Sequence, residues 1–268
     1  MNSLESKRVL IVGGSSGIGA AAAKAFAALG AQVTIASRNA QKLSAAAQEI
    51  GHGVQTAEID TTDAAAVEAF FTAQQPFDHV VISAAQTPSG PVRQLPLDDA
   101  YKAMDSKFWG AYRVARAVKI AEGGSLTFVS GFLAVRPSKM SVLQGAINAA
   151  LEALARGLAL ELSPVRVNTV SPGLIATPLW SKLTDEARDS MFEGAANRLP
   201  ARRVGQPEDV ANAIVYLATT PYARVRQCWS MAAVRSPERL KARYASVAPR
   251  SASNSRSTLR WQRFSCSQ

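Results

Sequence analysis

The chain has 268 residues, of which 47% are hydrophobic, and a formal net charge of +10. This length suits one large α/β domain with a single core, and no apolar run reaches the length of a membrane span. The charge is uneven, because residues 1–223 carry 20 Lys/Arg and 19 Asp/Glu, whereas residues 224–268 carry 10 Lys/Arg and only one acidic residue, Glu238. The nearly neutral body lacks the basic stripe of a nucleic-acid-binding protein, and we expect no nucleic-acid or membrane partner.

Cysteine and histidine usage gives no sign of a disulfide framework or a metal site. Both cysteines, Cys228 and Cys266, lie near the C-terminus, so the body has none to oxidise. His52 and His79 have no metal-ligand spacing and are predicted to lie in a loop or at a strand end. The first eight residues lack the apolar stretch of a secretory signal, which predicts a soluble, cytoplasmic protein.

The first predicted elements form a dinucleotide-binding turn. An apolar run at residues 9–12 is followed by Gly13-Gly14-Ser15-Ser16-Gly17-Ile18-Gly19, which opens an alanine-rich helical pattern over residues 20–29. The spacing of Gly17, Gly19 and Ala22 fits the G-x-G-x-x-G/A fingerprint in its strand-turn-helix context. Glycines let the backbone approach a pyrophosphate, whose charge is stabilised by the exposed amides of the helix start.

Strand and helix patterns then alternate along the body. Strands are predicted at residues 8–12, 33–36, 80–82, 126–129 and 165–170, with a weaker one near 54–59, and helices at 17–29, 40–49, 63–74, 98–120, 142–162 and 207–218. This order predicts a single α/β domain, a Rossmann-type doubly wound parallel sheet with helices on both faces in three α/β/α layers. The periodic apolar residues Leu143, Ile147, Leu151, Leu154 and Leu158 are predicted to face the core.

The end of the second predicted strand bears on the choice of cofactor. A site that prefers NAD places a carboxylate on the ribose, about twenty residues beyond the glycines. Here the strand ends in Ser37-Arg38 without a carboxylate. A hydroxyl and a guanidinium suit a 2′-phosphate, so the sequence favours NADP(H); a solvated arginine at a strand end is the alternative.

Several separated motifs make the chain resemble the short-chain dehydrogenase/reductase family over about residues 5–223. They are Gly13-x-x-x-Gly17-x-Gly19, Asp60-Thr61, Val165-Arg-Val-Asn168, Ser171-Pro-Gly-Leu-Ile-Ala-Thr177 and Arg203-Val-Gly-Gln-Pro-Glu-Asp-Val210. The resemblance implies that the segment from Pro172 to Leu199 covers the ligand. It also implies a set of cofactor-binding residues: Gly13, Ser15, Ser16, Gly17, Ile18, Gly19, Ser37, Arg38, Asp60, Thr61, Ser83, Ala84, Ala85, Pro172, Gly173, Ile175 and Thr177.

The catalytic positions of the family are all changed. Members of the family use a tyrosine proton donor, a lysine four residues later, a serine that polarises the carbonyl and an asparagine that supports a water relay. At these positions the chain has Gln144, Asn148, Gly131 (with Ser130 adjacent) and Lys107, respectively, and none of its tyrosines is followed by lysine four residues later. Glutamine releases no proton at accessible pH, and asparagine supplies no charge.

Three interpretations are therefore open. The chain is an NADP(H)-dependent oxidoreductase with a rebuilt site, in which Lys107 polarises the substrate or supplies the proton and Ser130, Gln144 and Asn148 give hydrogen bonds. Alternatively, it is an NADP(H)-binding sensor or regulatory protein without turnover, or a damaged copy whose folding fails. The substrate is a small molecule of unknown identity; Phe132, Leu133, Leu143, Leu179 and Trp180 suggest an apolar pocket or ordinary packing.

The composition changes after Ala223, where residues 224–268 are rich in Arg and Ser and show no sustained periodicity. A disordered basic extension is one interpretation. Alternatively, the segment is out-of-frame translation. We back-translated Arg224-Val-Arg-Gln-Cys-Trp-Ser-Met-Ala-Ala-Val-Arg235 with one choice of codons and shifted the reading frame by two bases. The shifted frame reads Gly-Ser-Thr-Val-Leu-Val-Asp-Gly-Gly-Gly-Ala, which resembles the family's last strand and its end. Trp229 and Met231 have unique codons, which constrain the valine and a glycine.

This frame-shift hypothesis places one missing base near codon 224. It predicts that the sheet has lost its last strand. An exposed sheet edge invites association. The resemblance implies a homo-oligomer, a dimer or a tetramer, and the family's tetramer commonly uses this region, so oligomerisation is in doubt for this chain.

Overall fold

The computed structural model describes residues 4–223 and the backbone of 227–228. The chain divides into a compact unit, residues 1–233, and a second unit, residues 234–268, which lies outside the described residues. The predicted disordered extension, residues 224–268, lies outside the described residues except for the backbone of 227–228.

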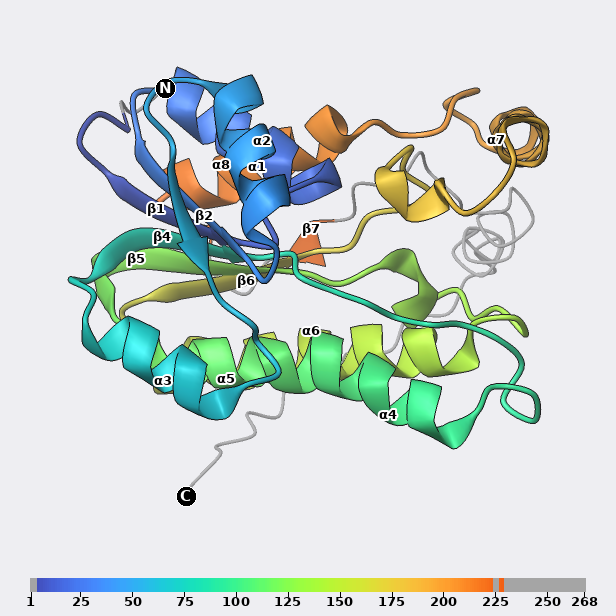
Figure 1. Ribbon diagram of the computed structural model, residues 1–268, viewed down its shortest axis with the longest axis horizontal. Coiled ribbons are helices and arrows are strands. Elements are labelled where there is room, and N and C mark those ends of the chain that lie inside the picture. Colours follow the sequence, from blue (N-terminus) through green and yellow to red (C-terminus); the bar gives the residue numbers. More distant parts are fainter. Residues whose placement is uncertain (1–3, 224–226, 229–268) are drawn as a thin grey trace, which may run out of the picture. The chain divides into compact units, whose positions relative to one another are not determined.

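Within the described residues, the first unit is built on one parallel sheet of seven strands in the order β3-β2-β1-β4-β5-β6-β7 (Figure 1). The strands are β1 (Arg8–Val12), β2 (Gln32–Ser37), β3 (Gln55–Glu58), β4 (Phe77–Ile82), β5 (Ile120–Val129), β6 (Arg166–Val170) and β7 (Gln227–Cys228). The helices are α1 (Gly17–Ala28), α2 (Ala40–Ile50), α3 (Ala64–Thr72), α4 (Leu97–Met104), α5 (Gly110–Ala117), α6 (Val142–Glu161), α7 (Asp185–Arg198) and α8 (Pro207–Thr219). The predicted Rossmann-type α/β fold is confirmed.

Each face of the sheet is covered by its own helices (Figure 1). Because side chains alternate along a strand, Val9 and Ile11 of β1 pack with α1, α2 and α8, whereas Leu10 and Val12 pack with α3, α5 and α6. The two apolar clusters form the core of a three-layer α/β/α structure. Burial of Ile147, Leu151 and Leu158 confirms the predicted core face of α6, with Leu143 and Leu154 half-buried at its edge.

At the outer edge of the sheet, β7 pairs with β6 through Thr169 and Val170. A strand of two residues thus occupies the edge at which the last strand was predicted to be missing, and the residues after it lie outside the described part. Side chains of β6 also hydrogen-bond to the carboxyl end of α8 and to Ala223, which lies between α8 and β7. The Arg166 guanidinium donates to the carbonyl oxygens of Leu217 and Ala218, and the Asn168 amide donates to that of Ala223 at 2.9 Å. These bonds fix the path of the chain up to Ala223.

Three details of the predicted elements were wrong. The helix predicted over 98–120 is divided into α4, a π-helical turn η1 (Asp105–Trp109) and α5, and it ends at residue 117 because β5 starts at residue 120. The 14-residue helix α7 was missed within the segment 172–199. His79 lies inside β4, buried, with its Nδ1 at 2.9 Å from the Ser125 hydroxyl, whereas His52 is in a loop as expected.

Candidate active site

The glycine turn between β1 and α1 leaves no room for side chains. Gly13 has φ of +89°, a left-handed conformation that favours glycine, and a Cβ there would lie 2.4 Å from the Ala84 nitrogen. A Cβ on Gly19 would lie only 2.1 Å from the carbonyl oxygen of Gly13. The backbone at this turn is therefore bare and closely packed, and it leads into the amino end of α1, which begins at Gly17. This is the geometry that an approaching pyrophosphate needs.

The other predicted cofactor residues gather at the same edge of the sheet. Ser37 ends β2, Asp60 and Thr61 follow β3, Ser83 to Ala85 follow β4, and Pro172 to Thr177 follow β6. Ser83 is tied to the glycine turn, because its hydroxyl lies 3.1 Å from the Val12 carbonyl oxygen. Thr177 reaches the turn from the other side, with its Cβ 3.4 Å from the position of a Cβ on Gly17. Ligands of open α/β sheets bind at this carboxyl edge, so the residues fit a dinucleotide.

Arg38 stands exposed beyond β2 and is held by a residue that the sequence did not single out. Its guanidinium donates a hydrogen bond to the side-chain oxygen of Gln86, in the loop after β4. The Gln86 backbone N–H in turn donates to the Ser106 hydroxyl at 2.8 Å. Asp60 is near enough to Arg38 to feel its charge, although the hydrogen bond from the Thr62 backbone is the main cause that lowers the pKa of that carboxyl. A cation is thus positioned where a 2′-phosphate is expected.

The candidate catalytic residues form a buried polar cluster beside this edge. The Lys107 Nζ donates to the Asn148 Oδ1 at 2.7 Å and to the Ser130 carbonyl oxygen at 2.9 Å. The Ser130 hydroxyl donates to the Glu152 Oε1 at 2.9 Å. The exposed fractions of Lys107, Ser130, Asn148 and Glu152 are 6%, 4%, 1% and 6%. Sequence reasoning brought three of these together but missed Glu152, although it lies one helical turn after Asn148 on α6.

The π-helical turn η1 positions Lys107 at the cluster. Such turns are rare and are frequently found at functional sites. The turn is followed by Gly110, where a Cβ would lie 2.8 Å from the Thr61 hydroxyl, so the helix packs closely against the segment after β3. At the other side of the turn, the Asp105 carboxylate pairs with Arg113 at 2.7 Å. The turn therefore directs Lys107 inward while its neighbours anchor it.

Burial shapes the chemistry of Lys107. Removal from water disfavours the ammonium and lowers the pKa of Lys107 to about 8, and the nearby Glu152 carboxylate opposes part of this effect. A lysine with a pKa near 8 still carries a proton at neutral pH and can release it. The cluster thus contains a group with a pKa suited to proton transfer, which Gln144 and Asn148 lack.

The other residues singled out from the sequence for the site lie on α6 or in the segments that precede and follow it in the chain. A Cβ on Gly131 would lie 2.6 Å from the Asn148 Nδ2, so Asn148 occupies the space that a side chain at 131 needs. Gln144 lies half-buried on α6, one turn before Asn148. Phe132 and Leu133 belong to the 3₁₀ turn η2 (Phe132–Ala134) before α6, and Leu179 and Trp180 to the turn η3 (Pro178–Trp180). The Trp180 indole donates to the Ile175 carbonyl oxygen at 2.9 Å, and Leu179 is 62% exposed.

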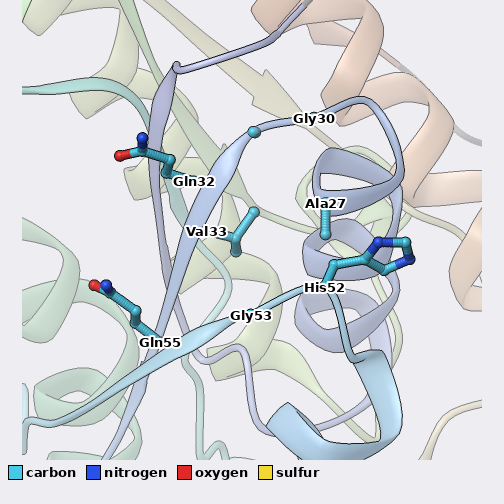
Figure 2. A pocket seen from close by; sticks show the side chains of 8 residues that line it. Ala27, Gly30, Gln32, Val33, His52, Gly53 and Gln55 are labelled. Atoms are coloured by element: carbon cyan, nitrogen blue, oxygen red, sulfur yellow. The ribbon is translucent and has the colours of Figure 1, made fainter.

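A hollow of about 350 Å³ lies elsewhere, at the amino ends of β2 and β3 (Figure 2). Ala27, Gly30, Gln32, Val33, His52, Gly53 and Gln55 line it together with Ala31. It faces away from the carboxyl edge that carries the glycine turn and Lys107, and no observation ties it to chemistry. Among residues 4–223, no group of His, Cys, Asp and Glu is arranged to hold a metal ion. Nor is any helix of this described part long and apolar enough to cross a membrane.

Comparisons with known proteins agree with this geometry. A family model described as enoyl-(acyl carrier protein) reductase matches residues 12–225. The short-chain dehydrogenase/reductase ucsE of Acremonium sp. is 30% identical over 242 residues, which cover 82% of this chain and 91% of that protein.

Two solved structures are also similar. A small-chain dehydrogenase in complex with NADPH superposes with a TM-score of 0.72 at 32% identity, covering 84% of this chain and 96% of the other. The MalC reductase/Diels-Alderase of Malbranchea aurantiaca has a TM-score of 0.79 at 26% identity, with 86% and 97% covered.

Proposed function

The chain belongs to the short-chain dehydrogenase/reductase family, and from this we propose that it is an NADP(H)-dependent oxidoreductase with a non-standard active site. Its substrate is a small carbonyl-like molecule. The observation that carries the proposal is the contact of Lys107 with Asn148 and Ser130 inside the site. Lysine and asparagine have exchanged positions relative to the family pattern, so the site keeps a buried amine although that amine comes from η1 instead of α6.

The proposed reaction assigns separate roles to the glycine turn, Arg38 and the Lys107 cluster. When bound, NADPH would supply the hydride to the substrate, or NADP⁺ would accept it in the reverse direction. The bare glycine turn and the amino end of α1 hold the pyrophosphate, and Arg38 holds the 2′-phosphate. The Lys107 ammonium polarises the substrate oxygen or gives it a proton, and Ser130, Gln144 and Asn148 orient it by hydrogen bonds. An activated acceptor, such as an iminium or an enone, needs less protonation than a plain ketone.

A panel of carbonyl, enone and imine acceptors tests this function by following NADPH oxidation at 340 nm. Turnover of at least one class, lost in Lys107→Ala, supports the rebuilt site. The second candidate function is an NADP(H)-binding sensor or regulatory protein, favoured by the absence of a tyrosine at position 144. Saturable NADPH binding without turnover of any class, unaffected by Lys107→Ala, supports the sensor.

The preference for NADPH is expected to depend on Arg38 and on the residue that holds it. We expect Arg38→Ala to weaken NADPH binding by about 10-fold or more, since a charged hydrogen bond contributes about 1.5–3 kcal/mol, and to leave NADH binding unchanged. Gln86→Ala removes the acceptor that holds the Arg38 guanidinium, and we expect it to weaken NADPH binding by a smaller factor. Fluorescence titration with both nucleotides measures this, with the exposed Arg93→Ala as the matched control. Equal losses for NADPH and NADH in Arg38→Ala would contradict the assignment.

We also propose that one base is missing near codon 224 and that residues beyond it are out-of-frame translation. The compositional break after Ala223 and the shifted reading support this. The position of β7 agrees with it, because the shifted reading, once its first codon is completed, places threonine and valine at 227 and 228, where the strand begins. Resequencing the gene across codon 224 decides the question; an intact frame there excludes it.

A further inference from the structure

Glu152 is the buried acidic residue of the cluster, and the proposed chemistry gives it no part. It lies on α6, 6% exposed, one turn after Asn148. Its Oε1 accepts the Ser130 hydroxyl at 2.9 Å, while the carbonyl oxygen of the same serine accepts the Lys107 ammonium at 2.9 Å. Ser130 therefore connects the carboxylate and the ammonium without a direct ion pair, and the Asn148 side chain accepts a second hydrogen bond from the ammonium.

A buried carboxylate is costly unless something compensates it. An unpaired buried charge is destabilising by several kcal/mol, and proteins keep such groups paired. Glu152 and Lys107 enter the same enclosed volume with opposite charges. Their attraction is strong there because little water separates them.

The other charged groups packed around η1 are not counter-charges of Lys107. On η1 itself, Asp105 pairs with Arg113 of α5 at 2.7 Å. On α4, Asp99 and Lys102 approach each other at 3.9 Å at the surface. The remaining charged side chains of the helices in contact with η1 are exposed: Asp98 on α4, Arg116 on α5, and Arg156 and Glu161 on α6. Glu152 is the charge that acts on the pKa of Lys107.

We propose that Glu152 is a positioning residue that keeps Lys107 charged and in place, acting through Ser130 as the buried counter-charge of the site. Its catalytic meaning rests on the proposed function, since a charged Lys107 is the form that can donate a proton. The structural statement, that the two groups are coupled, is independent of cofactor and substrate.

The pH dependence of unfolding tests the coupling directly. The pKa of Lys107 is about 8 in the folded chain and 10.5 is its ordinary value, so the unfolded chain binds more protons between these values. The free energy of unfolding therefore gains a contribution that rises with pH through this window. His79, whose pKa burial lowers to about 4 from 6.5, acts below the window. Urea unfolding of the full chain from pH 6.5 to 9.5, without cofactor, measures the contribution.

We expect Glu152→Gln to move the onset of this rise to lower pH by on the order of 1 unit. Lys107→Met should remove the contribution, and Glu161→Gln, at the exposed end of the same helix, should leave the onset unchanged. In the double variant Glu152→Gln/Lys107→Met, the glutamine should have no further effect on the pH dependence. An onset in Glu152→Gln equal to that of the parent chain would overturn the proposal.

Two further outcomes are informative. If Glu152→Gln does not fold but the double variant does, removal of the uncompensated ammonium has rescued the fold, which supports the coupling; failure of both variants to fold, with Lys107→Met folded, overturns it. Because neither NADPH nor a substrate takes part, an inactive protein that still shows the shifted onset refutes the proposed oxidoreductase function and leaves the role of Glu152 intact.

Discussion

Lys107→Met is expected to reduce kcat for NADPH oxidation by about 10²–10⁴-fold, the usual loss when general acid catalysis is removed. Lys107 is the group in the buried cluster whose pKa suits the release of a proton. It also lies within hydrogen-bond distance of Asn148 and Ser130. The residual rate then comes from orientation by the pocket and from hydride transfer alone. The measurement uses the acceptor class that the parent chain reduces best.

The fold should survive this substitution. Methionine resembles lysine in length and relieves a buried ammonium, but it leaves the Glu152 carboxylate without its counter-charge. We therefore expect the free energy of unfolding near pH 7 to fall by about 3–5 kcal/mol, less than the total stability of a typical domain. Lys102→Met, on the exposed face of α4, is the matched control and should keep full activity. If Lys107→Met keeps the parent kcat while Gln144→Ala loses it, the proton is supplied from α6 and the assignment to Lys107 is wrong.

The gathering of the candidate cofactor residues at one edge of the sheet was predictable because its signals are local. Each predicted residue follows a strand directly, and parallel strands bring their carboxyl ends to one edge, so the glycine turn, Ser37, Asp60 and Ser83 come together without further information. The contact between Lys107 and Asn148 could not be predicted from such local signals. It joins residues 41 positions apart and depends on the π-helical turn, which no apolar periodicity encodes.

Two other features escaped sequence reasoning for physical reasons. Helix α7 buries only Ala195 among its 14 residues, so it has no apolar stripe that a pattern could reveal. Its start was visible in principle, because Thr184 caps it by accepting the Ala187 backbone N–H, and Asp185 and Glu186 follow in the first turn. The place of Arg38 at the end of β2 followed from the strand pattern, whereas the Gln86 that holds it comes from a loop whose path the sequence does not give.

Restoring the reading frame is expected to produce the largest change in stability. In this structure β7 has two residues, which pair with Thr169 and Val170. The restored frame continues the strand with leucine and valine, and the burial of each such side chain contributes about 1.5–3 kcal/mol. We therefore expect insertion of one base at codon 224 to raise the free energy of unfolding by about 3–6 kcal/mol, measured by urea denaturation.

The contacts that direct the chain to the edge of the sheet are already present, so we expect the restored strand to form there and the gain in stability to be large. Arg166 and Asn168 fix the carbonyl oxygens at the end of α8 and at Ala223, so the chain enters the sheet edge in position to pair with β6. A full strand also covers the edge that invites association, and light scattering should then show one defined oligomer, a dimer or a tetramer. Insertion of three bases at the same codon, which adds a residue but keeps the present frame, is the matched control. Equal stability of both inserted chains would mean that the present C-terminal sequence completes the sheet as well as the restored one, and the frame-shift hypothesis would lose its physical support.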